Sequence, residues 1–181
     1  MRRPALALAA VALALTALPA AAALKEGTQA PDFTAQGYQA GKPISFSLAQ
    51  ARKKGPVVVY FFPAADTKGC NLEARLFAES MDQFTAAGAT VIGVTAGNLD
   101  KLAAFSADTE KCSGKFPVAA DQDATIAKRY DSTLAMRPGW ASRTSYVIAP
   151  DGKILHVHDA MSPDQHVTET LTAVKAWKAK Q

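Results

Sequence analysis

Apolar residues fill residues 57–62 (Val-Val-Val-Tyr-Phe-Phe), and residues 90–95 form a second uncharged segment around Val91, Ile92 and Val94. Runs of this length, rich in β-branched and aromatic residues, are typical of strands that are buried on both faces of a sheet. Residues 144–149 and 154–158 flank the turn sequence Pro-Asp-Gly-Lys and predict a β-hairpin. The pattern therefore predicts a sheet whose central strands are covered on both sides.

Other segments repeat their apolar residues at helical spacing. In residues 70–86, Leu72, Leu76 and Phe77 fall on one face of a predicted helix, and Gly88 predicts its C-terminal end. Strands that alternate with helices, followed by a hairpin and a last helix, predict an α/β protein with a central mixed sheet flanked by helices on both faces. This order matches the thioredoxin-like fold. The pattern predicts further helices at residues 99–107, 124–130 and 167–178, a helical turn at 47–54, and shorter strands at 33–38, 44–48 and 116–119.

Polar residues before two of these helices predict how the helices begin. Asn98 precedes the helix at residues 99–107, and Asp121 or Asp123 precedes the helix at residues 124–130. Side chains of this type accept hydrogen bonds from the free amides of the first helical turn. We therefore expect both helices to be capped by a side chain.

Residues 1–23 have the layout of a secretory signal peptide. Residues 2–3 are a short basic region, residues 6–18 form an apolar core, and a run of alanines ends at Ala23. This layout predicts cleavage after Ala23, whereas the alternative, a membrane anchor, needs a longer apolar stretch. We therefore expect residues 24–181 to form a single domain that is exported, to the periplasm if the source is Gram-negative.

The composition gives no support to several classes of function. The chain has 181 residues and a formal net charge of +4, to which Arg2 and Arg3 contribute. No basic stripe with interleaved aromatic residues follows the predicted signal peptide, so nucleic-acid binding has no support. We expect no nucleic-acid partner, no stable membrane association and a monomer, with a dimer as the alternative.

The first of the two cysteines stands at a position that predicts chemistry. Cys70 follows the apolar run 57–62 and a break at Pro63, at the point where the helix of residues 70–86 begins. The free amides and partial positive charge of a helix N-terminus favour a thiolate, which is the nucleophilic form of cysteine. Thr67, three residues earlier, can bring a hydroxyl to the same place.

The second cysteine, Cys112, leaves two interpretations open. In an exported protein, two cysteines often form a structural disulfide, because the compartment is oxidising. The other interpretation is a reactive pair that alternates between the thiol and the disulfide. The position of Cys70 favours the reactive pair, because a permanent disulfide would remove the activated nucleophile.

The residues around Cys70 resemble the active-site loop of the peroxiredoxins, which reads P-x-x-x-T-x-x-C and is matched by Pro63, Thr67 and Cys70. The chain is most similar to the peroxiredoxin Q, or bacterioferritin comigratory protein, subgroup. In addition, the segment that begins at Arg143 resembles the family's R-x-(S/T)-F-(L/V)-I-D-x-x-G-K-I pattern. The resemblance covers about residues 27–178. It implies a thioredoxin-like fold, thiol peroxidase activity, and no metal or organic cofactor.

The resemblance also implies a role for each matched residue. Cys70 attacks a peroxide oxygen and becomes a sulfenic acid. Arg143 holds the thiolate and polarises the peroxide, Thr67 orients the sulfur, and Pro63 shapes and shields the loop. The expected substrates are hydrogen peroxide and small organic hydroperoxides, and the expected reductant is an external thioredoxin-like or glutathione-like thiol.

One position departs from the pattern of the subgroup. Many members carry a second cysteine five residues after the first, but that position is Arg75 here. Cys112 loosely resembles the resolving cysteine of other members, so we expect it to form a disulfide with Cys70 during turnover. A one-cysteine enzyme resolved by an outside thiol is the alternative. Two other classes of function stay open: a redox-inert domain with a Cys70–Cys112 disulfide, and a protein thiol–disulfide oxidoreductase. Enzymes of the second class usually carry a C-x-x-C pair, which would place a cysteine at position 73, where this chain has Glu73.

Four other polar residues have weaker functional signals. Glu73 stabilises the start of the helix through its charge or, as the resemblance suggests, pairs with a nearby group. His156 and His158 face the same way on a predicted strand, but no third metal ligand accompanies them. His166 opens the last helix, and we expect it to be solvated.

Overall fold

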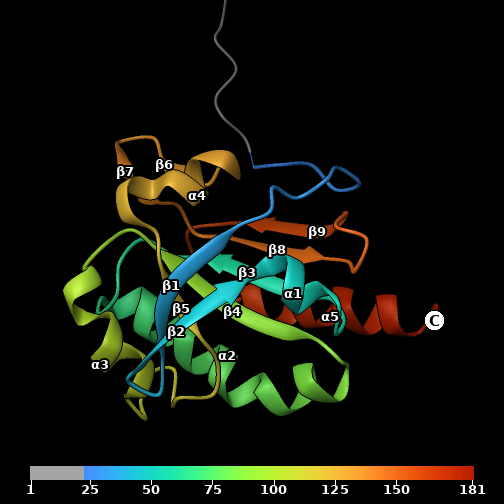
Figure 1. The fold of residues 1–181 in the computed structure, drawn as a ribbon, viewed down its shortest axis with the longest axis horizontal. Helices are drawn as coiled ribbons and strands as arrows, with labels where there is room; N and C mark the ends of the chain where they lie inside the picture. The colour runs from blue at the N-terminus through green and yellow to red at the C-terminus, as the bar shows by residue number, and fades with distance from the viewer. Residues whose placement is uncertain (1–22) are drawn as a thin grey trace, which may run out of the picture.

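The computed structural model describes residues 23–181, which form helices and strands around one main sheet (Figure 1). The strands are β1 (Thr34–Gln39), β2 (Lys42–Ser47), β3 (Val57–Phe61), β4 (Thr90–Thr95), β5 (Val118–Ala120), β6 (Thr133–Leu134), β7 (Arg137–Ala141), β8 (Thr144–Ile148) and β9 (Ile154–Asp159). The α-helices are α1 (Leu48–Arg52), α2 (Lys68–Ala86), α3 (Leu102–Ala107), α4 (Thr125–Arg129) and α5 (His166–Lys178), and two 3₁₀ turns are η1 (Leu99–Lys101) and η2 (Gln122–Ala124).

The main sheet has seven strands in the order β2-β1-β5-β4-β3-β8-β9. β3 is parallel to β4, and β4 is parallel to β5, whereas the other neighbouring strands are antiparallel. Every residue of β3 is buried, as expected for a central strand that is covered on both faces. The predicted central mixed sheet and the hairpin between β8 and β9 are therefore confirmed.

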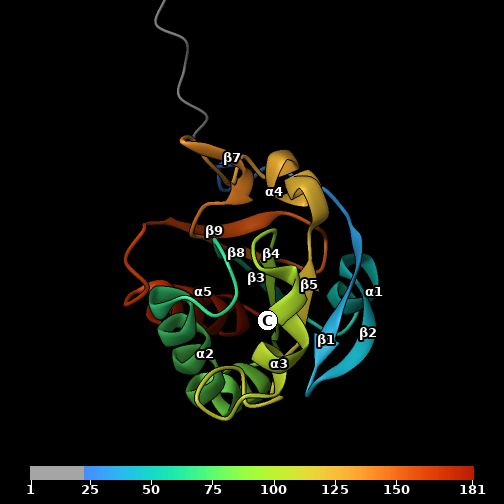
Figure 2. The ribbon, with the colours of Figure 1, turned by 90° about the vertical axis from the view of Figure 1, so that its left-hand side faces the viewer.

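Helices cover both faces of this sheet, as predicted. Because side chains alternate along a strand, Tyr60 and Phe62 face one core, which also contains residues of α2, α3 and α5. Val59 and Phe61 face a second core, which contains residues of α1 and α4. Figure 2 shows α2 and α5 on one side of the sheet and α1 on the other. The fold is thus a three-layer α/β arrangement.

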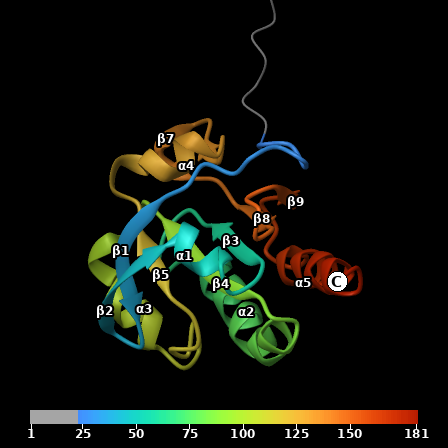
Figure 3. The same ribbon diagram turned by 45° about the vertical axis from the view of Figure 1, so that its right-hand side comes forward.

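α2 and α5 lie side by side on their face of the sheet (Figure 3). Near the C-terminal end of α2, the Lys178 ammonium donates to the carbonyl oxygen of Ala86 at 2.6 Å. A cation at this end of a helix satisfies a free carbonyl and interacts favourably with the helix dipole. Gly88 follows with a φ of 79°, which confirms it as the predicted C-terminal stop.

Two helix starts differ from the prediction. α2 begins at Lys68, two residues before the predicted start. The segment predicted as one helix from residue 99 begins as η1, and Asn98 adopts a left-handed conformation without capping it. At α4 the prediction is confirmed for Asp121, whose carboxylate accepts from the amides of Ile126 and Ala127, both at 2.8 Å.

The pair of strands β6 and β7 was not predicted. The two strands form a small separate sheet between α4 and β8. Pro138 and Gly139 lie within β7, and both residues are uncommon in strands. The hydrophobic pattern is therefore too weak there to indicate a strand.

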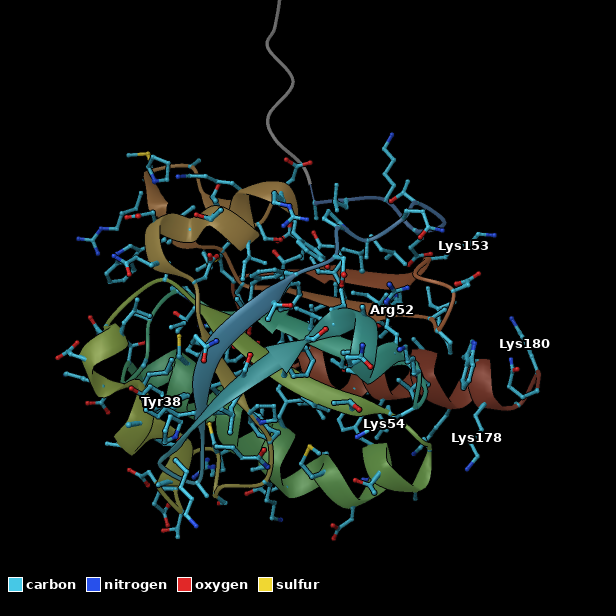
Figure 4. All side chains as sticks on the ribbon, in the orientation of Figure 1. Tyr38, Arg52, Lys54, Lys153, Lys178 and Lys180 are labelled. Carbon is cyan, nitrogen blue, oxygen red and sulfur yellow. The ribbon has the colours of Figure 1, made fainter. Side chains whose placement is uncertain are left out.

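Several labelled basic side chains gather at one end of the molecule, away from the N-terminal end of α2 (Figure 4). They include Lys178 and Lys180 at the end of α5 and Lys153 in the turn before β9. Within residues 23–181, no helix is both long and apolar enough to cross a membrane. The predicted signal peptide lies almost entirely outside the described residues.

Candidate active site

Cys70 lies in the first turn of α2, directly after the loop that follows β3. The preceding Thr67 is extended, with φ −115° and ψ 150°, and is the N-cap residue directly before the helix. Amides in a first helical turn have no partner within the helix and carry partial positive charge. The thiol of Cys70 is only 1% exposed, so this charge acts on it in a largely dry environment.

The loop at residues 63–67 is joined by hydrogen bonds to the segment that directly follows β4. The Ala65 amide donates to the Gly97 carbonyl oxygen at 3.2 Å, and the Asn98 side-chain amide donates to the Ala65 carbonyl oxygen at 2.8 Å. A Cβ atom on Gly97 would lie 2.5 Å from the carbonyl oxygen of Pro63. This close approach of two backbone segments therefore requires glycine.

Arg143 is the cation that faces the thiol. It precedes β8, is 4% exposed, and its Nη2 lies 3.5 Å from Cys70 Sγ. Its Nε donates to the Met161 carbonyl oxygen at 2.9 Å, and its Nη1 donates to the Glu73 carboxyl group. Burial lowers the pKa of Arg143, but the charges of Glu73 and Cys70 raise it more, and the net pKa lies above its ordinary value. The guanidinium is therefore a fixed positive charge beside the sulfur.

Glu73 lies one turn after Cys70 on α2 and is completely buried. Burial raises its pKa to about 8, and the charge and hydrogen bond of Arg143 limit the rise. Its carboxyl group therefore holds a proton to a higher pH than an exposed glutamate does. Of the two interpretations of this residue, the structure shows the pairing with a nearby group, and the group is Arg143.

His166 is completely buried, so the prediction that it is solvated is wrong. Its Nδ1 lies 2.8 Å from Ser145 Oγ and 3.6 Å from Glu73 Oε1, and its Nε2 lies 2.8 Å from the Ala160 carbonyl oxygen. Burial lowers the pKa of His166 to about 4. At neutral pH His166 is therefore uncharged, and its contact with Glu73 is not an ion pair.

A helical pattern in the sequence could have revealed the burial of His166. Thr170 and Val174 follow it at intervals of four residues, and both are buried. Residues at i, i+4 and i+8 share one helix face, so His166 belongs to the face of α5 that packs against the sheet. Its polarity and its position at a helix start obscured that signal.

Thr67 and Pro63 border the turn that contains Cys70. The Thr67 hydroxyl donates to the Ala64 carbonyl oxygen at 3.2 Å rather than to the sulfur. Thr67 and Pro63 are both half-buried. The structure therefore brings Cys70 and Arg143 into contact and sets the other two residues beside them, while their roles toward a peroxide stay predictions.

Cys112 lies in the segment between α3 and β5 and is completely buried. Burial raises the pKa of its thiol well above the ordinary value, and Lys111 opposes the rise. Cys70 and Cys112 are both free thiols that belong to one apolar cluster together with Tyr60. Burial, followed by Cys112, Glu73 and Cys70, raises the pKa of the Tyr60 phenol well above its ordinary value. Both sulfurs thus lie close to one neutral hydroxyl.

An ionic cluster connects the Cys70 loop to the segment of Cys112. Asp66 accepts from the Lys111 ammonium at 2.9 Å and from the Lys101 ammonium at 3.3 Å. Lys111 also lies 2.9 Å from Asp108. An open groove of about 740 Å³ separates α2 from this segment; it is lined by Lys68, Gly69, Asn71, Leu72, Arg75, Glu110 and Lys111.

Of the other predicted candidates, His156 lies apart from this site and His158 contacts its edge. His156 lies between two carboxylates, 2.9 Å from Glu26 and 3.4 Å from Glu169. The ring of His158 packs edge-on against His166, with ring centroids 4.5 Å apart. No group of three or more His, Cys, Asp or Glu residues within 23–181 is arranged to hold a metal ion. Arg75, at the position of the missing resolving cysteine, is exposed.

A buried thiol that contacts an arginine at a helix start, on a sheet of this order, is the arrangement of the thiol peroxidases, and the comparisons give the family. The model of the AhpC/TSA family matches residues 27–157. The chain therefore belongs to the AhpC/TSA family. It is a peroxiredoxin of thioredoxin-like fold, and the predicted family and fold are confirmed.

Similar proteins support this assignment over most of the chain. Peroxiredoxin Q from chloroplasts of Sedum lineare is 30% identical over 87% of this chain and 81% of its own length. Its counterpart from Arabidopsis thaliana is 32% identical over 86% of this chain and 69% of its own length. The crystal structure of the peroxidoxin BcpB from Mycobacterium tuberculosis has a TM-score of 0.73 and 29% identity, and the match covers 84% of this chain and 97% of that chain.

Proposed function

We propose that the protein reduces hydrogen peroxide and small organic hydroperoxides with Cys70 as the attacking thiolate. The observation that carries this proposal is the 3.5 Å contact between Cys70 Sγ and Arg143 Nη2 in the first turn of α2. A guanidinium in this place stabilises the thiolate and has further donors for a peroxide oxygen. The family assignment supports the same chemistry.

In the first step the Cys70 thiolate attacks one oxygen of the peroxide in line with the O–O bond. The S–O bond forms as the O–O bond breaks, the sulfur is oxidised, and the product on the enzyme is a sulfenic acid. The leaving oxygen takes one proton and departs as water or an alcohol. Thr67 and Pro63 border the approach to the sulfur and limit how a peroxide enters.

In the second step Cys112 attacks the sulfenic sulfur of Cys70, and a disulfide forms with loss of water. Both thiols lie near Tyr60 in one apolar cluster, which supports this pairing. Because both are buried, a disulfide requires local movement of the first turn of α2 or of the Cys112 segment. One external dithiol of the thioredoxin type, or two monothiols of the glutathione type, then restore both thiols and are themselves oxidised to a disulfide.

The experiment that tests this proposal measures peroxide consumption with dithiothreitol by the wild type, Cys70→Ser and Cys112→Ser. Non-reducing mass measurements after one equivalent of peroxide accompany it. We expect activity to be lost in Cys70→Ser, an intramolecular disulfide in the wild type, and a sulfenic acid that dimedone traps in Cys112→Ser.

Other outcomes would assign the protein differently. Undiminished turnover of Cys112→Ser without any disulfide would replace the two-cysteine cycle by a one-cysteine cycle. A wild type that consumes no more peroxide than Cys70→Ser would contradict the peroxidase. A disulfide that persists in that inactive protein would support the redox-inert alternative, and reduction of an insulin disulfide would support the oxidoreductase.

We also propose export of the protein, on the basis of the basic, apolar and small-residue regions in residues 1–23. Expression of the full chain in a Gram-negative host, followed by fractionation, tests this proposal. We expect the periplasmic fraction to contain a chain that begins at Leu24. An uncleaved chain in the cytoplasmic fraction would overturn it.

A further inference from the structure

We propose that Glu73 holds a proton behind Arg143, beside the neutral ring of His166, and that this keeps the charge of the buried site constant when Cys70 changes from a thiolate to a sulfenic acid. The inference rests on the proposed peroxidase reaction and adds a role for a residue that does not contact the peroxide. Glu73 is a positioning residue, because it acts through Arg143.

The first argument is a count of charges. Arg143 contacts two acidic groups, the Cys70 thiol and the Glu73 carboxyl, and all three side chains are almost completely buried. One buried cation balances one buried anion, and a second anion without a partner is costly there. When Cys70 is a thiolate, Glu73 therefore keeps its proton. When Cys70 is neutral, Arg143 favours an ionised Glu73.

The second argument is the position of the proton on Glu73. Oε2 accepts from Arg143, whereas Oε1 is buried and has no hydrogen-bond partner among residues 23–181. Oε1 lies 3.6 Å from Nδ1 of His166. A carbonyl oxygen can only accept, so the contact with Ala160 requires the proton of the neutral imidazole on Nε2. Nδ1 is then an acceptor, and it takes the hydroxyl proton of Ser145 at 2.8 Å, so the 3.6 Å contact with Glu73 Oε1 is not a hydrogen bond. Because Oε2 accepts from Arg143, the proton of a neutral Glu73 lies on Oε1, beside this uncharged ring.

The third argument is the surroundings of Glu73 and His166. The titratable or charged groups that face these two side chains are Cys70 on α2, Tyr60 on β3, Arg143 before β8 and His158 on β9. Burial raises the pKa of Glu73 to about 8 and lowers that of His166 to about 4. Arg143 is consequently the single fixed charge, and Glu73 is the group that exchanges a proton near neutral pH.

The proposed first step then balances within the protein. The thiolate and a protonated Glu73 react with ROOH to give the sulfenic acid, ROH and an ionised Glu73. The O–O bond breaks, the sulfur is oxidised, and the leaving oxygen gains one proton. Because Glu73 loses one proton in the same step, the reaction takes up no net proton from solution.

The experiment measures proton uptake when reduced protein reacts with one equivalent of hydrogen peroxide at pH 7 in weak buffer with an indicator dye. The Cys112→Ser background stops the reaction at the sulfenic acid, and absorbance at 240 nm reports the starting thiolate. We expect uptake near zero in this background. In Glu73→Gln we expect uptake of about one proton per thiolate consumed, because the leaving oxygen must take its proton from solution.

Matched variants separate this inference from a merely structural role. Glu79→Gln removes an exposed carboxylate on the same helix, and uptake should stay near zero. His166→Leu also keeps an uncharged side chain beside Oε1 of Glu73, and uptake should stay near zero there as well.

The same samples distinguish a failure of the proton-holding proposal from a failure of the proposed peroxidase function. If thiolate disappears and the unmodified background takes up one proton, as Glu73→Gln does, the proton-holding role of Glu73 is wrong although the peroxidase stands. If uptake in His166→Leu rises to about one proton, the imidazole and not Glu73 holds the proton. If peroxide is not consumed at all, the proposed function itself fails.

Discussion

At the scale of single residues, Arg143 contacts three groups with three different nitrogens. Nη2 faces the Cys70 sulfur, Nη1 bonds to Glu73, and Nε bonds to the carbonyl oxygen of Met161. A planar guanidinium holds these directions together, whereas an ammonium group is a single point of charge. The geometry of the site therefore depends on arginine and not only on a positive charge.

We predict that Arg143→Lys lowers the rate constant of Cys70 with hydrogen peroxide by about 100-fold, the usual cost of removing one well-placed donor from an active site. The ammonium cannot contact the sulfur and Glu73 while it also bonds to Met161. Stopped-flow measurement of thiolate loss at 240 nm tests this. Arg75→Lys, at an exposed position on α2, should react like the wild type, and an Arg143→Lys rate within twofold of the wild type would contradict the prediction.

The sequence predicted the site residues Cys70 and Arg143 better than the buried residues Glu73 and His166. Cys70 and Arg143 could be found because a cysteine after an apolar strand and a downstream arginine form a recognisable pattern. His166 could not be found in this way, since its burial depends on the packing of α5 against β8 and β9. The pairing of Glu73 was likewise left open, because the first turn of a helix explains a glutamate equally well.

At the scale of elements, the site depends on the contact between the Cys70 loop and the end of β4. We predict that Gly97→Ala destabilises the protein by about 1–3 kcal/mol, as is usual for overpacking, and also slows the reaction with peroxide. The added Cβ would lie 2.5 Å from the Pro63 carbonyl oxygen and 2.6 Å from Ala64 Cβ. Urea unfolding and stopped-flow rates measure the two effects.

Gly139→Ala is the matched control for this substitution. A Cβ at Gly139 meets nothing within 4 Å, so both stability and rate should remain close to those of the wild type. If Gly97→Ala behaved like this control, the close approach of the loop to β4 would not be needed for the site.

A second element-scale prediction concerns the ionic cluster around Asp66. Asp66→Asn should speed formation of the Cys70–Cys112 disulfide by a few-fold, because it weakens the link to Lys111 and thereby eases local opening. The effect stays small since partly exposed ion pairs contribute only about 0.2–1 kcal/mol. Quenched-flow mass measurement of the disulfide tests it. Asp100→Asn, a nearby exposed carboxylate, is the control, and a slower disulfide in Asp66→Asn would contradict the prediction.

Element boundaries were predictable where one physical signal dominated. The central strands β3 and β4 were predicted almost to the residue, because their apolar runs are uninterrupted by charge. The start of α2 was missed by two residues, since Lys68 and Gly69 carry no apolar signal. β6 and β7 were missed altogether. Both strands are short, and a Pro-Gly pair interrupts the pattern of β7.

At the scale of the whole molecule, the buried pair Glu73 and His166 makes stability depend on pH. Glu73 has a folded-state pKa of about 8 against an ordinary 4.5, so its contribution falls as pH rises through this window. His166 has a folded-state pKa of about 4 against an ordinary 6.5, so its contribution is lost as pH falls. Between pH 4.5 and 6.5 the two slopes oppose each other.

We therefore predict that the free energy of unfolding of the reduced protein decreases from pH 6.5 to pH 8, where Glu73 acts alone, by at most about 1.4 kcal/mol per pH unit. Urea unfolding at these two pH values measures the change. Glu73→Gln should remove most of the decrease, and Glu79→Gln should preserve it. A decrease of the same size in Glu73→Gln would show that another group is responsible.

The Cys70 loop is held to β4 mainly by backbone atoms, apart from the amide of Asn98. The hydrogen bond from Ala65 to Gly97 does not depend on the side chain of residue 66, which is exposed, whereas Ala64 and Ala65 are completely buried and must stay small. This separates the support of the sulfur from the surface that a reductant meets. Substitution of residue 66 by residues that tolerate its φ of 63°, such as asparagine or glycine, can therefore change that surface while the reacting group stays where it is.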